Sequence, residues 1–147
     1  MNDETAADRK NPAFDPASAG WEIGQSAAFG TLVGPIWRME ADDRLRFGFV
    51  VAPKHINRAG NVHGGMLMTL ADQSMAMASR PAIGGKRQAT MELNMQFIGP
   101  AHLGEFVEAH PAVVRVTRSV VFMEVKMFVG KRLVASANGI WKIVGER

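Results

Sequence analysis

The sequence predicts an α+β domain in which one long helix is followed by an antiparallel sheet. The first observation is a run of small and apolar residues over 64–80, closed by Pro81 and the Gly84-Gly85 pair. The second is a strict alternation of apolar and polar residues over 90–97, which is the pattern of a half-buried strand. The third is a series of further strand-like segments up to residue 144, separated by glycine turns. The sheet is expected to have about six strands, most of them after the helix.

Size and composition favour a single domain. The chain has 147 residues, of which 47% are hydrophobic and 21% charged, as in ordinary globular proteins. Residues 1–16 are polar and are expected to form a flexible tail, and residues 17–147 a single domain. The sequence has no cysteine, no apolar signal segment and no apolar run of roughly 20 residues. We therefore expect a cytoplasmic protein that does not enter a membrane.

The basic residues are scattered along the chain. The net charge is +3 and the pI about 9.7, but no block of like charge points to nucleic acid. One group of side chains falls around the last three strand segments, where the phosphates of an anionic ligand could bind. It consists of Arg118, Ser119, Lys131 and Arg132. Solvation of the surface explains these residues equally well, so both interpretations stay open.

Two strands are expected before the long helix. We expect a short helix or lid over residues 16–28, then a first strand over 31–40. A turn at residues 41–43 leads to a second strand, in which Leu45, Phe47, Phe49 and Val51 alternate with smaller or charged residues.

The strands after the helix are better defined. Over 90–97 one face is expected to be apolar, and it comprises Met91, Leu93, Met95 and Phe97. The opposite face is expected to carry Thr90, Glu92, Asn94 and Gln96. Further strands are predicted over 105–116, 119–129 and 132–144, and Pro111 indicates an edge position or a bulge in the first of these.

The stretch 57–72 carries the residues suited to chemistry. Asp72 is the only formally charged side chain between His63 and Arg80, and an acid on such an apolar helix is costly to bury without a partner. At the helix start, free N–H groups and two glycines, Gly64 and Gly65, would let a ligand oxygen approach the backbone.

Structural interpretations of the same residues remain open. The two glycines could serve close packing of the helix on the sheet, and Asn57 could cap its own turn. Asp72 could be a structural acid paired with Arg80, His63 or Thr90, and Thr90 could be an ordinary sheet residue.

These residues resemble the PaaI-like, phenylacetate-pathway branch of the hotdog-fold acyl-CoA thioesterases. The match rests on Asn57, Gly60, the trio His63-Gly64-Gly65, Leu70, Asp72, Thr90, Asn94 and the turn Gly99-Pro100-Ala101 with Gly104. The resemblance implies a hotdog fold, in which an antiparallel sheet of about six strands wraps one central helix. It also implies a homodimer, often assembled into a homotetramer, with the active site at the dimer interface.

The resemblance also implies roles for individual residues. Asp72 would be the nucleophile or the general base, the Gly64 N–H would polarise the thioester carbonyl, and Asn57 would position water or thioester. Thr90 of the partner protomer would assist near the carboxylate, at a position where close relatives often have serine.

Further residues of the site would bind the substrate, an acyl-CoA. They are His63, Gly65, Arg118 and Ser119. No cofactor is implied, and the four histidines lack the spacing of a zinc site.

The position of Asp72 on the helix bears on the site as well. It lies about two and a half turns from the helix start, too far to reach a carbonyl bound at the first turn of its own chain. We therefore expect a site shared between two chains.

Two other functions remain open, an acyl-thioester hydratase or dehydratase of the same fold and a non-catalytic acyl-CoA-binding module.

Overall fold

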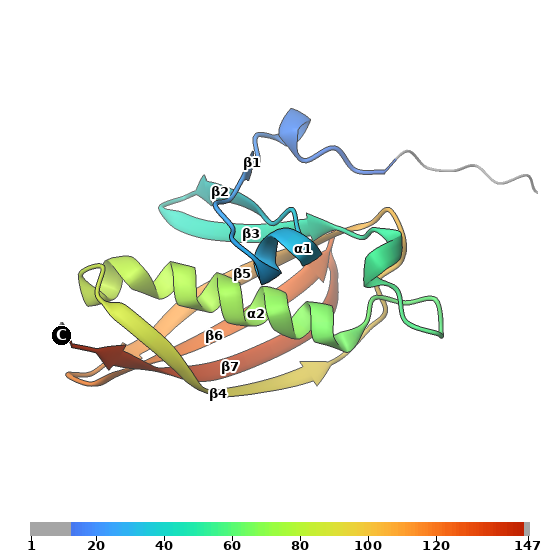
Figure 1. Ribbon diagram of the computed structural model, residues 1–147. Helices are drawn as coiled ribbons and strands as arrows, with labels where there is room; N and C mark the ends of the chain where they lie inside the picture. Colours follow the sequence, from blue (N-terminus) through green and yellow to red (C-terminus); the bar gives the residue numbers. More distant parts are fainter. Residues whose placement is uncertain (1–12, 146–147) are drawn as a thin grey trace, which may run out of the picture.

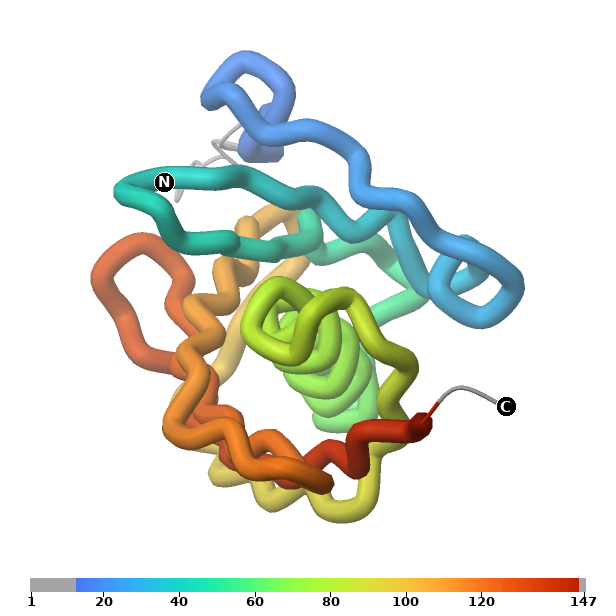
Figure 2. The backbone as a smooth tube through the Cα atoms, turned by 90° about the vertical axis from the view of Figure 1, so that its left-hand side faces the viewer, coloured from blue at the N-terminus to red at the C-terminus, as the bar shows by residue number. Residues whose placement is uncertain are grey.

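In the computed structural model, which describes residues 13–145, a seven-stranded antiparallel sheet curls around one central helix (Figures 1 and 2). The strand order is β1-β2-β3-β5-β6-β7-β4. The strands are β1 (Glu22–Ile23), β2 (Trp37–Ala41), β3 (Arg44–Val50), β4 (Arg87–Phe97), β5 (Phe106–Val116), β6 (Val120–Val129) and β7 (Arg132–Val144). The helices are α1 (Phe29–Val33) and α2 (Gly64–Ser79), with short 3-10 turns η1 (Ala17–Ala19), η2 (Pro53–His55) and η3 (Arg80–Ile83). The predicted α+β hotdog architecture is confirmed, with one strand more than expected.

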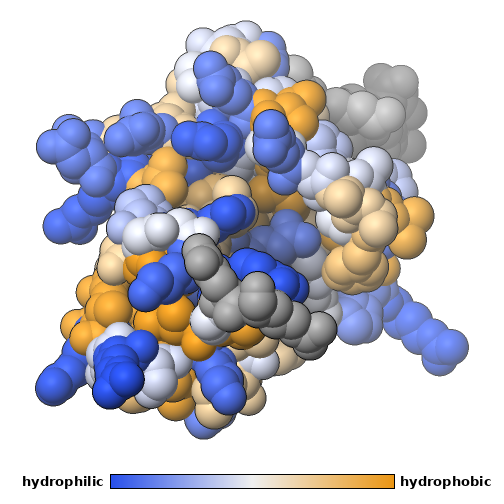
Figure 3. Space-filling model, turned by 60° about the vertical axis from the view of Figure 1, so that its left-hand side comes forward, coloured by the Kyte–Doolittle hydropathy of each residue, from blue (hydrophilic) through white to orange (hydrophobic). Residues whose placement is uncertain are grey.

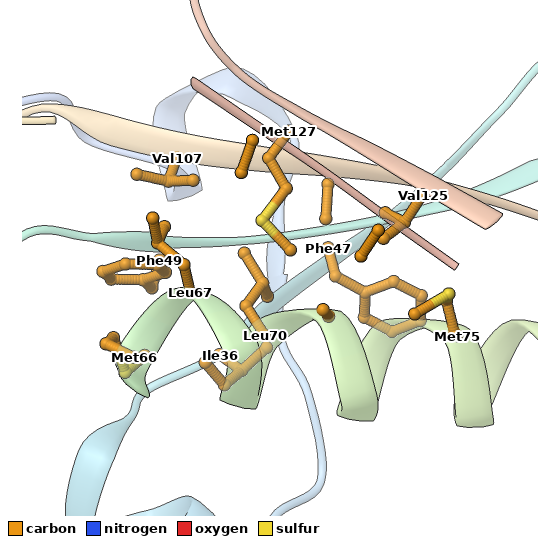
Figure 4. Packing of buried hydrophobic residues seen from close by; sticks show 14 of the residues in the cluster. Ile36, Phe47, Phe49, Met66, Leu67, Leu70, Met75, Val107, Val125 and Met127 are labelled. Atoms are coloured by element: carbon orange, nitrogen blue, oxygen red, sulfur yellow. The ribbon is translucent and has the colours of Figure 1, made fainter. Parts of the chain in front are cut away.

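The central helix α2 forms because its sequence holds no proline and a single β-branched residue, Thr69. It ends where η3 begins with Arg80-Pro81, and Gly84 follows in the left-handed conformation. One stripe of the helix is buried: Met66, Leu67, Leu70, Ala71, Ser74, Met75 and Ser79. Figure 4 shows Leu67 and Leu70 pointing from α2 toward side chains of the sheet. The opposite face of α2 is partly exposed in the single chain.

The segment before β2 differs from the prediction. Residues 16–28 do not form the expected helix; they contain η1 and β1, and the helix α1 lies later in the chain, at Phe29–Val33. The first long strand consequently begins at Trp37 rather than at residue 31. Tertiary pairing decides this, because β1 joins the edge of β2 and the Gly24 N–H donates to the Ile36 carbonyl at 2.8 Å.

The expected flexible tail is only partly inside the described chain. Residues 1–12 lie outside the described residues. Phe14 stacks on Phe106 with ring centroids 4.8 Å apart, and Pro16 is buried. The end of the predicted tail therefore packs on the domain.

A β-bulge in β4 changes which residues face the helix. Thr90 pairs with Trp141 and Glu92 pairs with Ile140, so Met91 is an extra residue in β4. Directly paired residues share a face of the sheet, and Trp141 is 1% exposed in the core. Thr90 therefore lies on the helix-facing side. The simple alternation was wrong for this residue.

Pro111 lies in the part of β5 that no longer pairs with β3. The ladder between β3 and β5 ends at Ala109, so on that side the following part of β5 is an edge. The missing N–H of a proline is tolerated in such a place. The expected edge position is confirmed, and a separate irregularity occurs between Val113 and Arg115.

On the face seen in Figure 3, hydrophilic and hydrophobic side chains are interspersed, and neither kind covers the whole face. Within residues 13–145, neither helix has the length and apolar character that a membrane-crossing helix needs.

Candidate active site

A short hairpin over residues 55–63 leads into α2. Its strands are joined by the bridge between Ile56 and Val62, and the Asn57 N–H donates to the Asn61 carbonyl at 2.8 Å. Asn57 Oδ1 accepts hydrogen bonds from the N–H groups of Ala59, at 2.9 Å, and Asn61, at 3.1 Å. The capping interpretation of Asn57 is thus confirmed for its oxygen. Its Nδ2 group has no acceptor among the described residues and remains free for a ligand.

The first turn of α2 leaves one N–H group without a partner. His63 caps the helix: its Nδ1 accepts from Gly65 N–H at 2.8 Å, and its carbonyl accepts from Met66 at 2.9 Å and Leu67 at 3.4 Å. Across the described chain nothing accepts from the N–H of Gly64. This group is therefore the candidate polariser of a carbonyl.

Two of the predicted substrate-binding residues, His63 and Gly65, have a structural role at the start of α2. The Gly65 N–H is taken up by the His63 ring, so Gly65 offers no free donor to a ligand. Neither His63 nor Gly65 lines the pocket described next. Their position beside Gly64 nevertheless fixes the free N–H.

A pocket of about 570 Å³ opens beside Gly64. It is lined by Asn57, Asn61, Val62, Gly64, Leu67 and residues 97–101, none of which is charged. The pocket brings together Asn57, Gly64 and the predicted turn at Gly99. A Cβ on Gly64 would lie 3.1 Å from the ring of Phe97, so the exposed Phe97 side chain would have to shift slightly to admit a larger residue.

Asp72 finds its partner on β4 of the same chain. Thr90 Oγ1 donates to Asp72 Oδ1 at 2.6 Å. The prediction that Thr90 reaches the carboxylate from the partner protomer is therefore wrong for this hydrogen bond, which lies within one chain. β4 follows α2 after a short connection, and the bulge at Met91 turns Thr90 toward the helix. Of the three partners considered for Asp72, this chain supplies Thr90.

The two parts of the predicted site are separate within one chain. Asp72 does not line the pocket at Gly64. Asp72 lies eight positions after Gly64 on α2, which corresponds to about 12 Å along the helix axis. Within a single chain the Asp72 carboxylate and the Gly64 N–H are therefore too far apart to contact the same atom.

Arg118 and Ser119 lie away from the Gly64 pocket. Both are exposed in the turn between β5 and β6, and the Ser119 carbonyl accepts from Ile143 N–H at 2.8 Å. Ile143 pairs with Gln88, so this turn is level with the start of β4. The structure does not bring these two residues together with Gly64.

The other basic residues considered for anion binding lie at a different turn. Lys131 is exposed in the turn between β6 and β7, and Arg132, the exposed first residue of β7, is paired with Glu105 at 2.8 Å. An ion pair of this kind is the ordinary role of a surface arginine.

Lys54 and His55 form structural hydrogen bonds in this region that were not predicted from the sequence. Lys54 Nζ donates to the carbonyls of Leu32, at 3.1 Å, and Gly34, at 2.6 Å. His55 Nε2 donates to the Val33 carbonyl at 2.6 Å, while its Nδ1 accepts from Ala52 N–H at 2.9 Å. Burial lowers the pKa of His55, and the Lys54 charge lowers it further. The only sequence signal was a basic pair just before Asn57.

Metal chemistry has no evident site in residues 13–145, where no three His, Cys, Asp or Glu side chains gather to hold an ion.

Comparison with known proteins gives the family. Residues 59–136, over half of the chain, match the model of the Thioesterase superfamily. A Pseudomonas aeruginosa protein named as a candidate esterase, PA0474, is 33% identical over 117 residues, which cover 76% of this chain and 85% of that protein.

Solved structures agree with this match. A point mutant of the phenylacetic acid degradation protein PaaI from Thermus thermophilus superposes with a TM-score of 0.71 and 25% identity, covering 79% of this chain and 98% of that one. The BH2602 protein from Bacillus halodurans, solved with CoA, gives a TM-score of 0.67 and 26% identity over 75% of this chain and 74% of that one. The chain belongs to the thioesterase superfamily, as a PaaI-like member with the hotdog fold.

Proposed function

We propose that the protein is an acyl-CoA thioesterase, which hydrolyses an acyl- or aryl-CoA to a free acid and coenzyme A. The observation that carries this proposal is the unpartnered Gly64 N–H at the start of α2, in a pocket without charged side chains. Membership of the thioesterase superfamily and the CoA bound to a related structure support the substrate class.

The chemistry requires a polarised carbonyl and an oxygen nucleophile. A backbone donor that meets the developing oxyanion contributes about 2.7–4 kcal/mol in acyl-transfer enzymes. The partial positive charge of a helix start adds to this effect at Gly64. Asn57 Nδ2, free of partners among the described residues, is a suitable second donor to the thioester or to water.

Asp72 would supply the nucleophile. As a general base it takes a proton from water, whose oxygen attacks the carbonyl carbon. The C–S bond then breaks and the proton passes from Asp72 to the departing sulfur, which releases the coenzyme A thiol. As a nucleophile its oxygen bonds to the carbonyl carbon while the C–S bond breaks and coenzyme A leaves as a thiolate, which takes a proton from solvent; water then hydrolyses the acyl anhydride and regenerates the carboxylate. The Thr90 bond occupies Oδ1 and orients the carboxylate, so that Oδ2 is available for either role.

The active site would be shared between two chains. Asp72 of one protomer would act on a thioester whose carbonyl is held by Gly64 of the partner, since one chain keeps them about 12 Å apart. The edge strand β4 supports such pairing, because its exposed Met91 and Phe97 are 61% and 56% accessible in the single chain. We propose a homodimer, or a homotetramer built from two such dimers.

Two further parts of the proposal concern the surroundings of the site. Arg118 and Ser119 are proposed to bind the phosphates of coenzyme A, from the turn that is level with the start of β4.

We also propose a cytoplasmic location, with which the absence of cysteine from the sequence agrees.

A thiol-release assay over aryl- and alkyl-CoA substrates tests this function, with Asp72→Asn as the matched variant. We expect turnover by the wild type and a kcat at least about 100-fold lower for the variant, with its fold retained. Unchanged turnover in Asp72→Asn would remove the role of Asp72. If acyl-CoA binds but no substrate is turned over, the protein is a binding module.

A further inference from the structure

Lys54 and His55 hold the end of α1 through three consecutive carbonyl groups. Lys54 donates to those of Leu32 and Gly34, and His55 Nε2 donates to that of Val33. The last carbonyls of a helix have no partner inside the helix and are favourable places for a cationic side chain. We refer to Lys54 and His55, with these three bonds, as the carbonyl clamp.

Apolar packing alone attaches α1 weakly to the domain. Of its five residues only Gly30 is buried, while Phe29 is 58% and Leu32 71% exposed. A Cβ on Gly30 would lie 3.1 Å from Nε2 of Gln73, so α1 lies within reach of the Gln73 side chain of α2. The clamp bonds therefore carry a large share of the attachment of α1.

The clamp also forms the base of the hairpin that carries Asn57. The His55 carbonyl accepts from His63 N–H at 2.7 Å, where the two ends of the hairpin meet. His63 in turn accepts from Gly65 and from the two residues after it, which fixes the first turn of α2. A continuous series of hydrogen bonds thus runs from α1 through His55 and His63 to the turn that holds the Gly64 N–H.

His55 is well suited to this place because its ring is 4% exposed and packs edge-on against Phe49, with centroids 4.9 Å apart. Its two nitrogens have opposite roles, one accepting from Ala52 and the other donating to Val33. The neutral ring, which burial favours by lowering the pKa of His55, satisfies both roles at once.

We propose that the carbonyl clamp positions the Gly64 N–H for catalysis, which makes Lys54 and His55 positioning residues and α1 a part of the active site. This inference rests on the thioesterase function proposed above. Neither side chain touches the reacting atoms. They act by holding the hairpin base, and with it the start of α2, in a fixed place relative to the pocket.

Substitutions at Lys54 test the clamp, because this side chain is exposed and its loss should leave the fold intact. Lys54→Met keeps the apolar stem and removes the donors. We expect its kcat to fall about tenfold with KM changed by less than about twofold, since misplaced groups reduce transition-state stabilisation. Lys54→Arg should restore kcat because it keeps the charge and several donors. Lys142→Met, at an exposed position on β7, serves as the control for loss of one positive charge.

A second measurement does not depend on turnover. Hydrogen exchange at the His63 and Gly65 amides, which are hydrogen-bonded on either side of Gly64, is followed without substrate. It should be faster in Lys54→Met and in His55→Gln by about fivefold or more, and unchanged in Lys142→Met. If the wild type hydrolyses no acyl-CoA, the thioesterase proposal fails while this measurement still decides whether the clamp holds the start of α2.

Two outcomes overturn the inference. One is unchanged exchange at the His63 and Gly65 amides in both clamp variants. The other is a loss of thermal stability in both variants with kcat per folded protein equal to that of the wild type, which would make the clamp structural only. Faster exchange together with a lower kcat at constant KM supports it.

Discussion

Thr90 Oγ1 donates a 2.6 Å hydrogen bond to Asp72 Oδ1, joining the edge strand β4 to the central helix within one chain. The bond orients the carboxylate that we propose for catalysis. A hydrogen bond to a charged group is typically worth about 1.5–3 kcal/mol.

Replacing the hydroxyl measures this bond. Thr90→Val keeps the shape of the side chain and removes the donor, so we expect kcat to fall about 10- to 100-fold. Thr90→Ser keeps the hydroxyl and should stay within about threefold of the wild type. Steady-state kinetics on one acyl-CoA compare the three proteins. Equal loss in the serine and valine variants would contradict a role for the hydroxyl.

The bulge that turns Thr90 inward depends on Gly139. A Cβ at this position would lie 2.7 Å from the Glu92 carbonyl oxygen and 2.7 Å from the Trp141 ring. We expect Gly139→Ala to destabilise the fold by about 1–3 kcal/mol and to lower activity, because β4 must move. Gly145→Ala is the matched control, since nothing lies within 4 Å of its Cβ position. Denaturant unfolding and kinetics would show the difference, and equal stability of the two variants would argue against the close contact.

The role of the Gly64 N–H can be separated from the need for space at the same residue. Gly64→Ala adds a Cβ near Phe97 but keeps the N–H, whereas Gly64→Pro adds the same Cβ with two further ring carbons and removes the N–H. Proline is well tolerated at the first position of a helix, and the preceding His63 already has φ −61° and ψ 133°, which suit a residue before proline. We expect the proline variant to show a kcat about 100- to 1000-fold below that of the alanine variant. Similar kcat values would mean that the N–H does not stabilise an oxyanion.

The buried His55 should make stability depend on pH. Its pKa in the folded chain lies below its ordinary value of 6.5, chiefly because of burial. The unfolded chain therefore binds more protons than the folded chain between these two pKa values, so the free energy of unfolding rises with pH there. The stabilisation is fully present above pH 6.5 and is lost as the pH falls toward the folded pKa, by at most about 1.4 kcal/mol per unit.

Comparison with His55→Gln isolates this contribution, because the other histidines are common to both proteins. Denaturant unfolding between about pH 5 and pH 8 should give a curve that is flatter for the variant than for the wild type. Parallel curves would show that His55 does not titrate below its ordinary value.

Mixing two inactive variants tests the shared site. Asp72→Asn keeps Gly64, and Gly64→Pro keeps Asp72, so a mixed dimer contains one site with both intact residues. Random pairing should restore about a quarter of the wild-type sites, detectable as thiol release after co-expression or co-refolding. Activity that stays at the level of the separate variants would indicate that each chain carries a complete site.

The sequence by itself determined the central helix, the strands after it and the family of this protein. A run of small and apolar residues closed by Pro81 and Gly84 defined α2 to within a residue, because proline and glycine end a helix. The spacing of Asn57, Gly64 and Asp72 was readable because the motif is local. Each of these residues is fixed by its own turn or helix.

Only the tertiary structure decided which groups meet. Thr90 faces Asp72 because one extra residue in β4 reverses the alternation, and a bulge depends on the partner strand and not on the strand's own pattern. The placement of α1 and the clamp at Lys54 and His55 arise from hydrogen bonds between segments about 20 residues apart, which periodicity does not record. The free N–H of Gly64 became identifiable only after the bonds of its neighbours were known, because hydrogen bonding of a backbone group is decided by the whole fold.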